Sequence, residues 1–283
     1  MTRSARGYVL GGYVLGGLAM AAVALPGPGA AQSLPPDGES ATARLAASPR
    51  HGEWVTYDAG GGDEVEAWVS YPERSDAAPV VVVIHDIRAM SDWARAVADQ
   101  LAADGFIAVA PDLLSGKGPE GGGTASLDPD EVGRAMRDLD PTEVNRRLRA
   151  AAAYGTSLPA ASDEVGAVGF CWGGSTSFNF AVDFAGLDAA VVYYGASPPT
   201  EALARIQAPV LGHYGGADDR VNATLPDARA EMERLGKRYD VHIYQGAGHG
   251  FLKGQGGMDG ANLAASELAW PHTIEFFRET LGG

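Results

Sequence analysis

A single cysteine lies between two glycines in the stretch Gly169-Phe170-Cys171-Trp172-Gly173, and it is the only cysteine of the chain. The spacing Gly-x-Cys-x-Gly is typical of a strand-to-helix turn that exposes a nucleophile, here with sulfur in place of the usual oxygen. Such a turn is strained and brings backbone segments close together, which explains a glycine two residues to either side. The thiol could be a nucleophile, a redox or metal-binding group, or a small buried residue in a packing turn.

An acid and a histidine follow the cysteine along the chain, each in a glycine-rich loop. The loop 215–221 contains the adjacent aspartates Asp218 and Asp219, and the loop 246–251 contains His249. A catalytic thiol needs a base, and the base needs an acid that orients it. The order nucleophile, acid, histidine is that of α/β-hydrolases. Adjacent side chains point in different directions, so the residues alone leave open which aspartate is the acid that orients the histidine.

The attack of such a nucleophile on a carbonyl creates an oxyanion, which backbone N–H groups can stabilise. One donor would be Trp172, directly after the cysteine. In α/β-hydrolases a second donor comes from the loop after the third strand. Here that loop reads His85-Asp86-Ile87-Arg88, and the N–H of Ile87 is the candidate.

Short apolar runs alternate with helical segments from about residue 52 and would position these side chains. Alternating runs at 53–59 and 65–72 predict an antiparallel hairpin, and unbroken apolar strands are predicted at 79–85, 106–113, 164–170, 189–195, 209–215 and 240–246. Continuous apolar strands separated by helices indicate an α/β fold, with a mostly parallel sheet flanked by helices on both faces. Chemistry in such sheets occurs at the carboxyl ends of the strands, where the candidate loops lie.

Composition narrows the range of partners and cofactors. The 283 residues carry a net charge of −15, so we expect no nucleic acid partner, because an anionic surface repels phosphates. A single cysteine excludes a disulfide within the chain. The sequence has no HExxH or CxxC pattern, and we expect no metal and no other cofactor. A zinc site built from Cys171, His249 and an aspartate is the alternative.

The N-terminus has the pattern of an export signal. Arg3 and Arg6 precede an apolar run at 8–25 and a small-residue site at 29–31. We expect a signal peptide at 1–31 that is cleaved, and a periplasmic or secreted protein with no membrane attachment; a retained membrane anchor is the alternative. Residues 32–50 are rich in proline, serine and alanine and are predicted to be a flexible linker before one domain at 51–283.

From about residue 52 to 281 the chain resembles the dienelactone hydrolase family. The resemblance rests on the segments VVVIHDI, FIAVAPDLL, VGFCWGG, GGADDRV and GAGHGF, which occur in this order. It implies an α/β-hydrolase fold and hydrolysis of a small-molecule ester or lactone through an acyl-thioester on Cys171. A non-catalytic or redox thiol protein on the same scaffold is the alternative function, and a ligand-binding module with an aromatic pocket is a third.

The resemblance also assigns the remaining site residues. The family's acid lies in a Gly-x-x-Asp-x-x-Val pattern, which selects Asp218 as the partner of His249. Asp86 stands where the family has a glutamate that contacts the resting thiol and helps to activate it, and it is one methylene shorter. Lys253 and Lys117 stand near the places of two arginines that hold a substrate carboxylate, and lysine lacks their planar fork. The sequence makes no prediction of oligomeric state.

Overall fold

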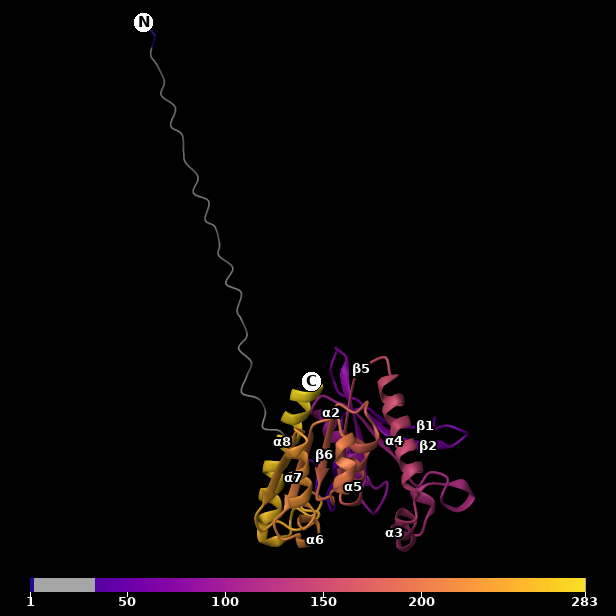
Figure 1. Ribbon diagram of the computed structural model, residues 1–283. Helices are drawn as coiled ribbons and strands as arrows, with labels where there is room; N and C mark the ends of the chain where they lie inside the picture. The colour runs from indigo at the N-terminus through magenta and orange to yellow at the C-terminus, as the bar shows by residue number, and fades with distance from the viewer. Residues whose placement is uncertain (3–33, 283) are drawn as a thin grey trace. The chain divides into compact units, whose positions relative to one another are not determined.

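An eight-stranded sheet forms the centre of the domain (Figure 1). The computed structural model describes residues 1–2 and 34–282, and those from Leu34 onward belong to one compact unit. The strand order is β1-β2-β4-β3-β5-β6-β7-β8. The strands are β1 (Gly52–Asp58), β2 (Glu64–Ser70), β3 (Ala78–Ile84), β4 (Ile107–Pro111), β5 (Ala161–Phe170), β6 (Ala189–Tyr193), β7 (Val210–Gly215) and β8 (Tyr239–Tyr244). β1 and β2 pair antiparallel, as do β2 and β4, whereas the pairs from β4 across to β8 are parallel.

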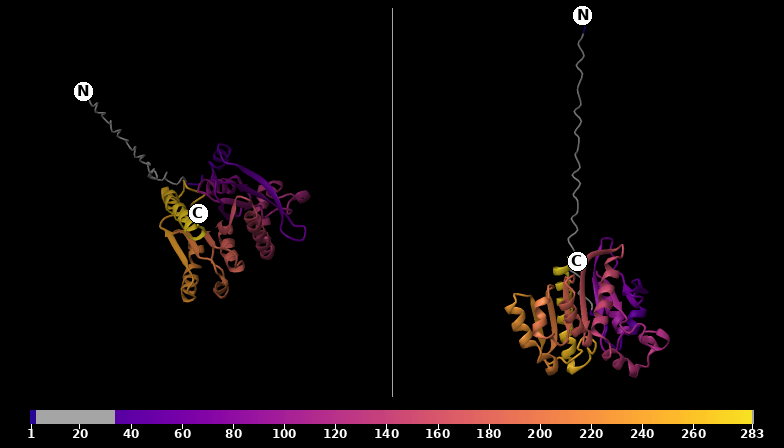
Figure 2. Two further views of the ribbon diagram at one scale, coloured as in Figure 1. Left: turned by 90° about the horizontal axis from the view of Figure 1, so that it is seen from above. Right: turned by 45° about the vertical axis from the view of Figure 1, so that its right-hand side comes forward.

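Helices cover both faces of this sheet, as Figure 2 shows from two further directions. They are α1 (Ala41–Ala46), α2 (Asp92–Ala103), α3 (Pro129–Arg137), α4 (Pro141–Thr156), α5 (Trp172–Asp183), α6 (Asp219–Asn222), α7 (Leu225–Arg234) and α8 (Ala261–Leu281), with short 3₁₀ helices at Pro119–Gly121, Thr124–Ser126, Thr200–Arg205 and Met258–Gly260. One apolar cluster joins the sheet to α4, α5 and α7, and another joins it to α2 and α8. The predicted α/β fold with a mostly parallel sheet is therefore confirmed.

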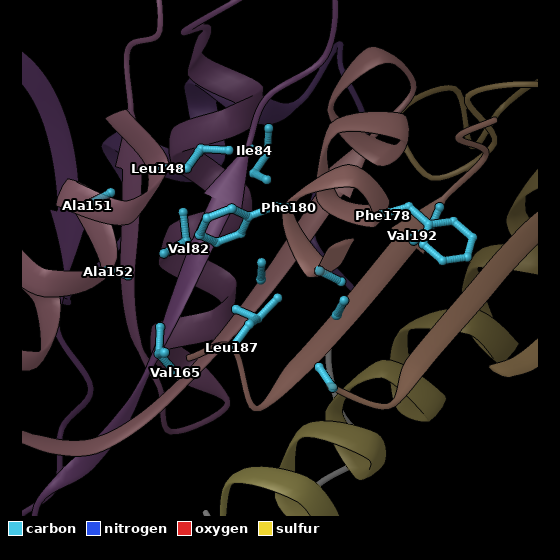
Figure 3. Close-up of a cluster of buried hydrophobic side chains, with 14 of the residues drawn as sticks. Val82, Ile84, Leu148, Ala151, Ala152, Val165, Phe178, Phe180, Leu187 and Val192 are labelled. Atoms are coloured by element: carbon cyan, nitrogen blue, oxygen red, sulfur yellow. The ribbon is translucent and has the colours of Figure 1, made fainter. Parts of the chain in front are cut away.

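Strand β3 shows why both faces must be covered. Its apolar run Ala78–Ile84 is buried along its whole length. Because successive side chains of a strand point to opposite faces, Val82 and Ile84 pack with α4 and α5 (Figure 3), whereas Val81 and Val83 pack with α2 and α8. Each fully buried valine contributes about 1.5–3 kcal/mol, so the strand and the loop that follows it are firmly placed.

The predicted flexible linker is wrong for residues 34–50. This segment packs on the domain, and α1 within it lies against α2. Pro36 O accepts a hydrogen bond from Trp93 Nε1 at 3.0 Å, and Arg50 forms an ion pair with the buried Asp99 at 2.5 Å. The composition suggested a linker because these partners lie 57 and 49 residues away, where no local pattern can reveal them. The predicted domain boundary at residue 51 is accordingly too late.

The predicted export signal at 1–31 lies almost entirely outside the described residues. Among the helices that the structure describes, none is both long enough and apolar enough to cross a membrane.

Candidate active site

The candidate nucleophile occupies the sharp turn between β5 and α5. Cys171 has φ 57° and ψ −113°, a backbone conformation that residues other than glycine rarely adopt. Its N–H donates to Tyr193 O on the neighbouring strand β6 at 3.0 Å, and the residue is partly exposed. Strain of this kind persists only where the surrounding structure maintains it, and it is concentrated at functional sites.

Two glycines make the turn possible. A Cβ on Gly169 would lie 1.8 Å from Gly173 O, and a Cβ on Gly173 would lie 2.3 Å from both Ile84 O and His85 O. The opposing atoms are backbone, so no side-chain rotation could relieve either clash. The start of α5 is therefore pressed against the end of β3, which brings the cysteine next to the loop that follows β3.

His249 and Asp218 meet from the loops that follow β8 and β7. His249 Nδ1 lies 2.5 Å from Asp218 Oδ2, and the other oxygen of this buried carboxylate accepts from Val221 N at 3.4 Å. A hydrogen bond with Cys171 raises the pKa of His249; the bond with Asp218 adds to this rise, and burial opposes it. Asp219 is exposed in the first turn of α6, so the structure brings Asp218 rather than Asp219 to the histidine.

The loop after β3 leaves the N–H of Ile87 without an acceptor. His85 Nε2 accepts from Leu113 N at 3.3 Å, so His85 Nδ1 carries the proton and donates to Asp86 O at 3.1 Å. In a trans peptide the C=O and the N–H point in opposite directions, so the Ile87 N–H points away from His85. Within the described chain neither this N–H nor that of Trp172, the first residue of α5, has an acceptor.

Asp86 is hydrogen-bonded to a lysine instead of the thiol that the resemblance led us to expect. Lys253 Nζ donates to Asp86 Oδ2 at 2.6 Å, and Arg88 N donates to Oδ1 at 2.7 Å. Hydrogen bonds from an ammonium to a carboxylate are stronger than those from a neutral thiol, which explains the choice of partner. Lys253 also lies over the Trp93 ring, 5.1 Å from its centroid. Lys253 therefore borders the site, but with its charge already paired.

Lys117 lies apart from the other candidate site residues. Its ammonium pairs with Glu143 of α4 at 2.8 Å, and Glu143 also pairs with Arg147 at 2.9 Å. The sequence placed Lys117 near the site because it follows β4, but the loop carries the side chain to α4. Both lysines that were expected to hold a substrate carboxylate are thus bound to carboxylates of the protein.

Tyr194 borders the site without having been assigned to it from the sequence. Its ring meets the His249 ring edge-on at 5.2 Å, and its φ of 41° departs from the strand conformation. Its hydroxyl is buried and has no hydrogen-bond partner in the described chain. Tyr194 ends the apolar run AAVVYY, which predicts a core residue; only its backbone conformation and its neighbours place it at the site.

A cavity of about 900 Å³ opens beside His249, and Asp37, Glu39 and Lys253 are among its lining residues. A second hollow of about 1010 Å³ lies between the β1–β2 hairpin and α4, but it holds none of the candidate catalytic residues. Among the described residues, no three histidine, cysteine, aspartate or glutamate side chains are grouped so that they could hold a metal ion.

A parallel sheet with a strained cysteine turn after β5, an acid after β7 and a histidine after β8 defines an α/β-hydrolase. The chain belongs to the dienelactone hydrolase family, whose model matches residues 65–281. The predicted family is confirmed, and with it the class of the protein as a carboxylic ester or lactone hydrolase.

Known proteins resemble this chain over most of its length. A Saccharolobus solfataricus protein described as "Putative carboxymethylenebutenolidase" is 29% identical over 255 residues, which cover 79% of this chain and 97% of that protein. A solved "Putative Dienelactone Hydrolase" from Klebsiella pneumoniae has a TM-score of 0.70 at 21% identity and covers 81% of this chain and 99% of its own. A dienelactone hydrolase-like promiscuous phosphotriesterase from metagenomic libraries has a TM-score of 0.69 at 25% identity. The match covers 82% of this chain and 98% of that protein.

Proposed function

We propose that this protein hydrolyses small-molecule esters or lactones with Cys171 as nucleophile, His249 as base and Asp218 as the orienting acid. The observation that carries the proposal is the 2.5 Å contact between His249 Nδ1 and Asp218 Oδ2, made by a histidine whose pKa the Cys171 thiol raises. The carboxymethylenebutenolidase description of the Saccharolobus relative supports a substrate of the ester or lactone class.

The first half of the reaction forms an acyl-thioester. His249 accepts the thiol proton as sulfur attacks the carbonyl carbon, and Asp218 stabilises the imidazolium. The N–H groups of Ile87 and Trp172 stabilise the oxyanion, and one such donor contributes about 3 kcal/mol to the transition state. When the tetrahedral intermediate collapses, the carbon–oxygen bond of the ester breaks and the leaving oxygen takes the proton from His249.

The second half of the reaction releases the acid and restores the thiol. His249 accepts a proton from water, whose oxygen attacks the thioester carbonyl, and the sulfur leaves with the proton that His249 returns to it. In this proposal Asp86 is a positioning residue in the resting state, because it precedes Ile87 and its carboxylate binds both Arg88 N, directly after Ile87, and Lys253. Activation of the thiol by Asp86 stays a prediction and would require Asp86 to leave Lys253.

We further propose that the protein is exported by its N-terminal signal and acts in the periplasm or outside the cell. The pattern of Arg3 and Arg6 followed by the apolar run at 8–25 supports this proposal. Cell fractionation with N-terminal sequencing of the purified protein tests it. A start near residue 32 in the exported fraction is the expected result, whereas an intact N-terminus in the cytosol contradicts it.

Single substitutions test the catalytic proposal. Cys171→Ala and His249→Ala are expected to reduce hydrolysis of p-nitrophenyl acetate and of a simple γ-lactone by about 10³-fold or more. His51→Ala is the matched control, because His51 is exposed and lies outside the site. Rapid quenching followed by intact-mass measurement should show an acyl group on wild-type protein and none on Cys171→Ala.

Equal activity of all variants would reject the triad. In that case Cys171 would not carry the hydrolysis, the alternative of a redox thiol on a hydrolase scaffold would apply, and oxidation of Cys171 would leave the esterase activity unchanged.

A further inference from the structure

Residues 37–39, within the segment 34–40, line the cavity beside the candidate base. Gly38 N donates to Lys253 O at 2.8 Å, and Gln255 Nε2 donates to Pro35 O at 2.9 Å. The backbone of the segment is thereby tied to the loop that continues from the histidine.

Carboxylates dominate the charge of this cavity. Asp37 and Glu39 line it together with His249 and Lys253. Hydrogen bonds from the side chain and backbone of the nearby serine lower the pKa of Asp37, so it is ionised at neutral pH. Lys253 is the one lysine or arginine among the lining residues, and Asp86 neutralises it at 2.6 Å. The cavity therefore presents unbalanced negative charge to whatever enters beside His249.

The position of the base shows which part of a substrate meets this charge. In the proposed reaction the leaving oxygen takes its proton from His249, so the alcohol portion of an ester lies on the His249 side of the nucleophile. Because His249 also lines the cavity, an alcohol portion that reaches His249 reaches the edge of this cavity.

We propose that Asp37 and Glu39 select esters whose alcohol portion is neutral or cationic and reject those whose alcohol portion is anionic. The inference rests on the proposed function and narrows its substrate class. Charges separated by less than about 10 Å interact appreciably at about 0.1 M salt, and added salt screens them. Two ion pairs also support rejection of anionic substrates. Lys117 is paired with Glu143 and Lys253 with Asp86, so neither lysine is left to hold a substrate carboxylate.

The first test compares acetate esters that differ only in the charge of the alcohol. A trimethylammonium group, the isosteric tert-butyl group and a carboxylate give cationic, neutral and anionic members of one series. At low ionic strength we expect kcat/KM of the cationic ester to exceed that of the anionic ester about tenfold, and this ratio to shrink about threefold at roughly 0.5 M salt. Asp37→Asn combined with Glu39→Gln should reduce the ratio to about twofold.

A matched double variant controls for the loss of two charges. Asp227→Asn combined with Glu233→Gln on α7 removes the same net charge from residues that do not line the cavity. It should leave the cationic-to-anionic ratio at the wild-type value. Asparagine can still accept the hydrogen bonds that Asp37 receives from Ser40, so the local fold is retained.

The second test needs no ester turnover, because Cys171 is the only cysteine of the chain. Cationic and anionic methanethiosulfonates of equal size transfer an alkylthio group to the thiol and release methanesulfinate. The cationic reagent should react faster, and the Asp37→Asn/Glu39→Gln variant should lose this preference.

Three outcomes separate the inference from the proposed function. Charge preference in both tests that disappears in the cavity variant supports the inference. Hydrolysis of the neutral ester with equal labelling by both reagents, or with a ratio that the cavity variant leaves unchanged, overturns the inference and leaves the proposed function intact. Absence of all hydrolysis overturns the proposed function, and labelling then decides separately whether Asp37 and Glu39 control access to the thiol.

Discussion

The contact between Asp218 Oδ2 and His249 Nδ1 determines which ring nitrogen faces the thiol. With Nδ1 turned to the carboxylate at 2.5 Å, Nε2 is the nitrogen left for Cys171. The carboxylate itself is held by Val221 N at the start of α6. One buried aspartate thus sets both the tautomer and the orientation of the proposed base.

Asp218→Asn should lower kcat/KM about 10³–10⁴-fold and move the acid limb of its pH profile to lower pH. Hydrogen bonds with Cys171 and Asp218 raise the pKa of His249 above its usual 6.5. Because neutral His249 accepts the thiol proton, wild-type kcat/KM should rise as pH rises through that raised value. Loss of the carboxylate removes one cause of the rise, so the residual activity should appear at lower pH.

The measurement is kcat/KM for p-nitrophenyl acetate from about pH 5 to pH 9. Asp219→Asn is the control, since Asp219 is exposed one residue away. A displaced limb in Asp219→Asn together with an unchanged limb in Asp218→Asn would contradict the assignment of the acid.

At the scale of elements, the junction of β5 and α5 requires glycines, which have no side chain. Gly169→Ala would place a Cβ 1.8 Å from Gly173 O, so the turn must open or the protein must unfold. We expect a loss of about 3 kcal/mol or more in the free energy of unfolding, measured by urea denaturation. Gly256→Ala is the control, because nothing lies within 4 Å of its added Cβ. Equal stability of the two variants would refute the described packing of the turn.

Trp93 joins three elements that are distant in sequence. Its indole N–H donates to Pro36 O, its ring lies beneath Lys253, and it packs edge-on against Phe170 of β5 at 5.0 Å. Helix α2 thus supports both the segment 34–40 and the cavity wall.

Trp93→Phe should therefore loosen the segment 34–40. The loss of the indole donor leaves Pro36 O without its partner, and we expect about 1–3 kcal/mol of destabilisation together with faster proteolysis within residues 34–50. Trp54→Phe is the control, because Trp54 is 48% exposed. Unchanged proteolysis in Trp93→Phe would show that other contacts hold the segment.

At the scale of the whole molecule, three histidines lie where α8 packs on β7 and β8. His213 is fully buried, with Nδ1 2.9 Å from the Tyr244 hydroxyl and Nε2 3.1 Å from Thr273 Oγ1. Its ring centroid lies 5.6 Å from that of His242 and 6.5 Å from that of His272. Burial, together with these two histidines, lowers the pKa of His213 well below its usual 6.5.

This cluster should make the fold sensitive to mild acid. Below about pH 6.5 the unfolded chain binds a proton at His213 that the folded state cannot bind, so the free energy of unfolding falls as pH falls. For this single site the slope is about 1.4 kcal/mol per pH unit until the folded-state pKa is reached. Urea unfolding from about pH 7.5 to pH 5 measures it. His213→Gln should flatten the profile, His51→Gln should not, and a flat wild-type profile would contradict the account.

The sheet and the three candidate catalytic loops could be predicted because their signals are local. An unbroken apolar run such as 79–85 indicates a strand that is buried on both faces, and Gly-x-Cys-x-Gly indicates a turn that only glycines permit. The partners of Asp86 and Lys117 could not be predicted in this way. Asp86 meets Lys253 across 167 residues, and such a pairing leaves no periodicity or spacing in the chain.

The sequence by itself therefore determined the α/β fold, the family and the candidate triad residues, because each depends on short contiguous motifs, and the strands that precede the triad residues, β5, β7 and β8, keep their chain order in the sheet. Only the tertiary structure decided that residues 37–39 line the cavity, and that both candidate substrate lysines are already paired. Charge pairing depends on which side chains folding brings within hydrogen-bonding distance, and that distance is a property of the packed molecule alone.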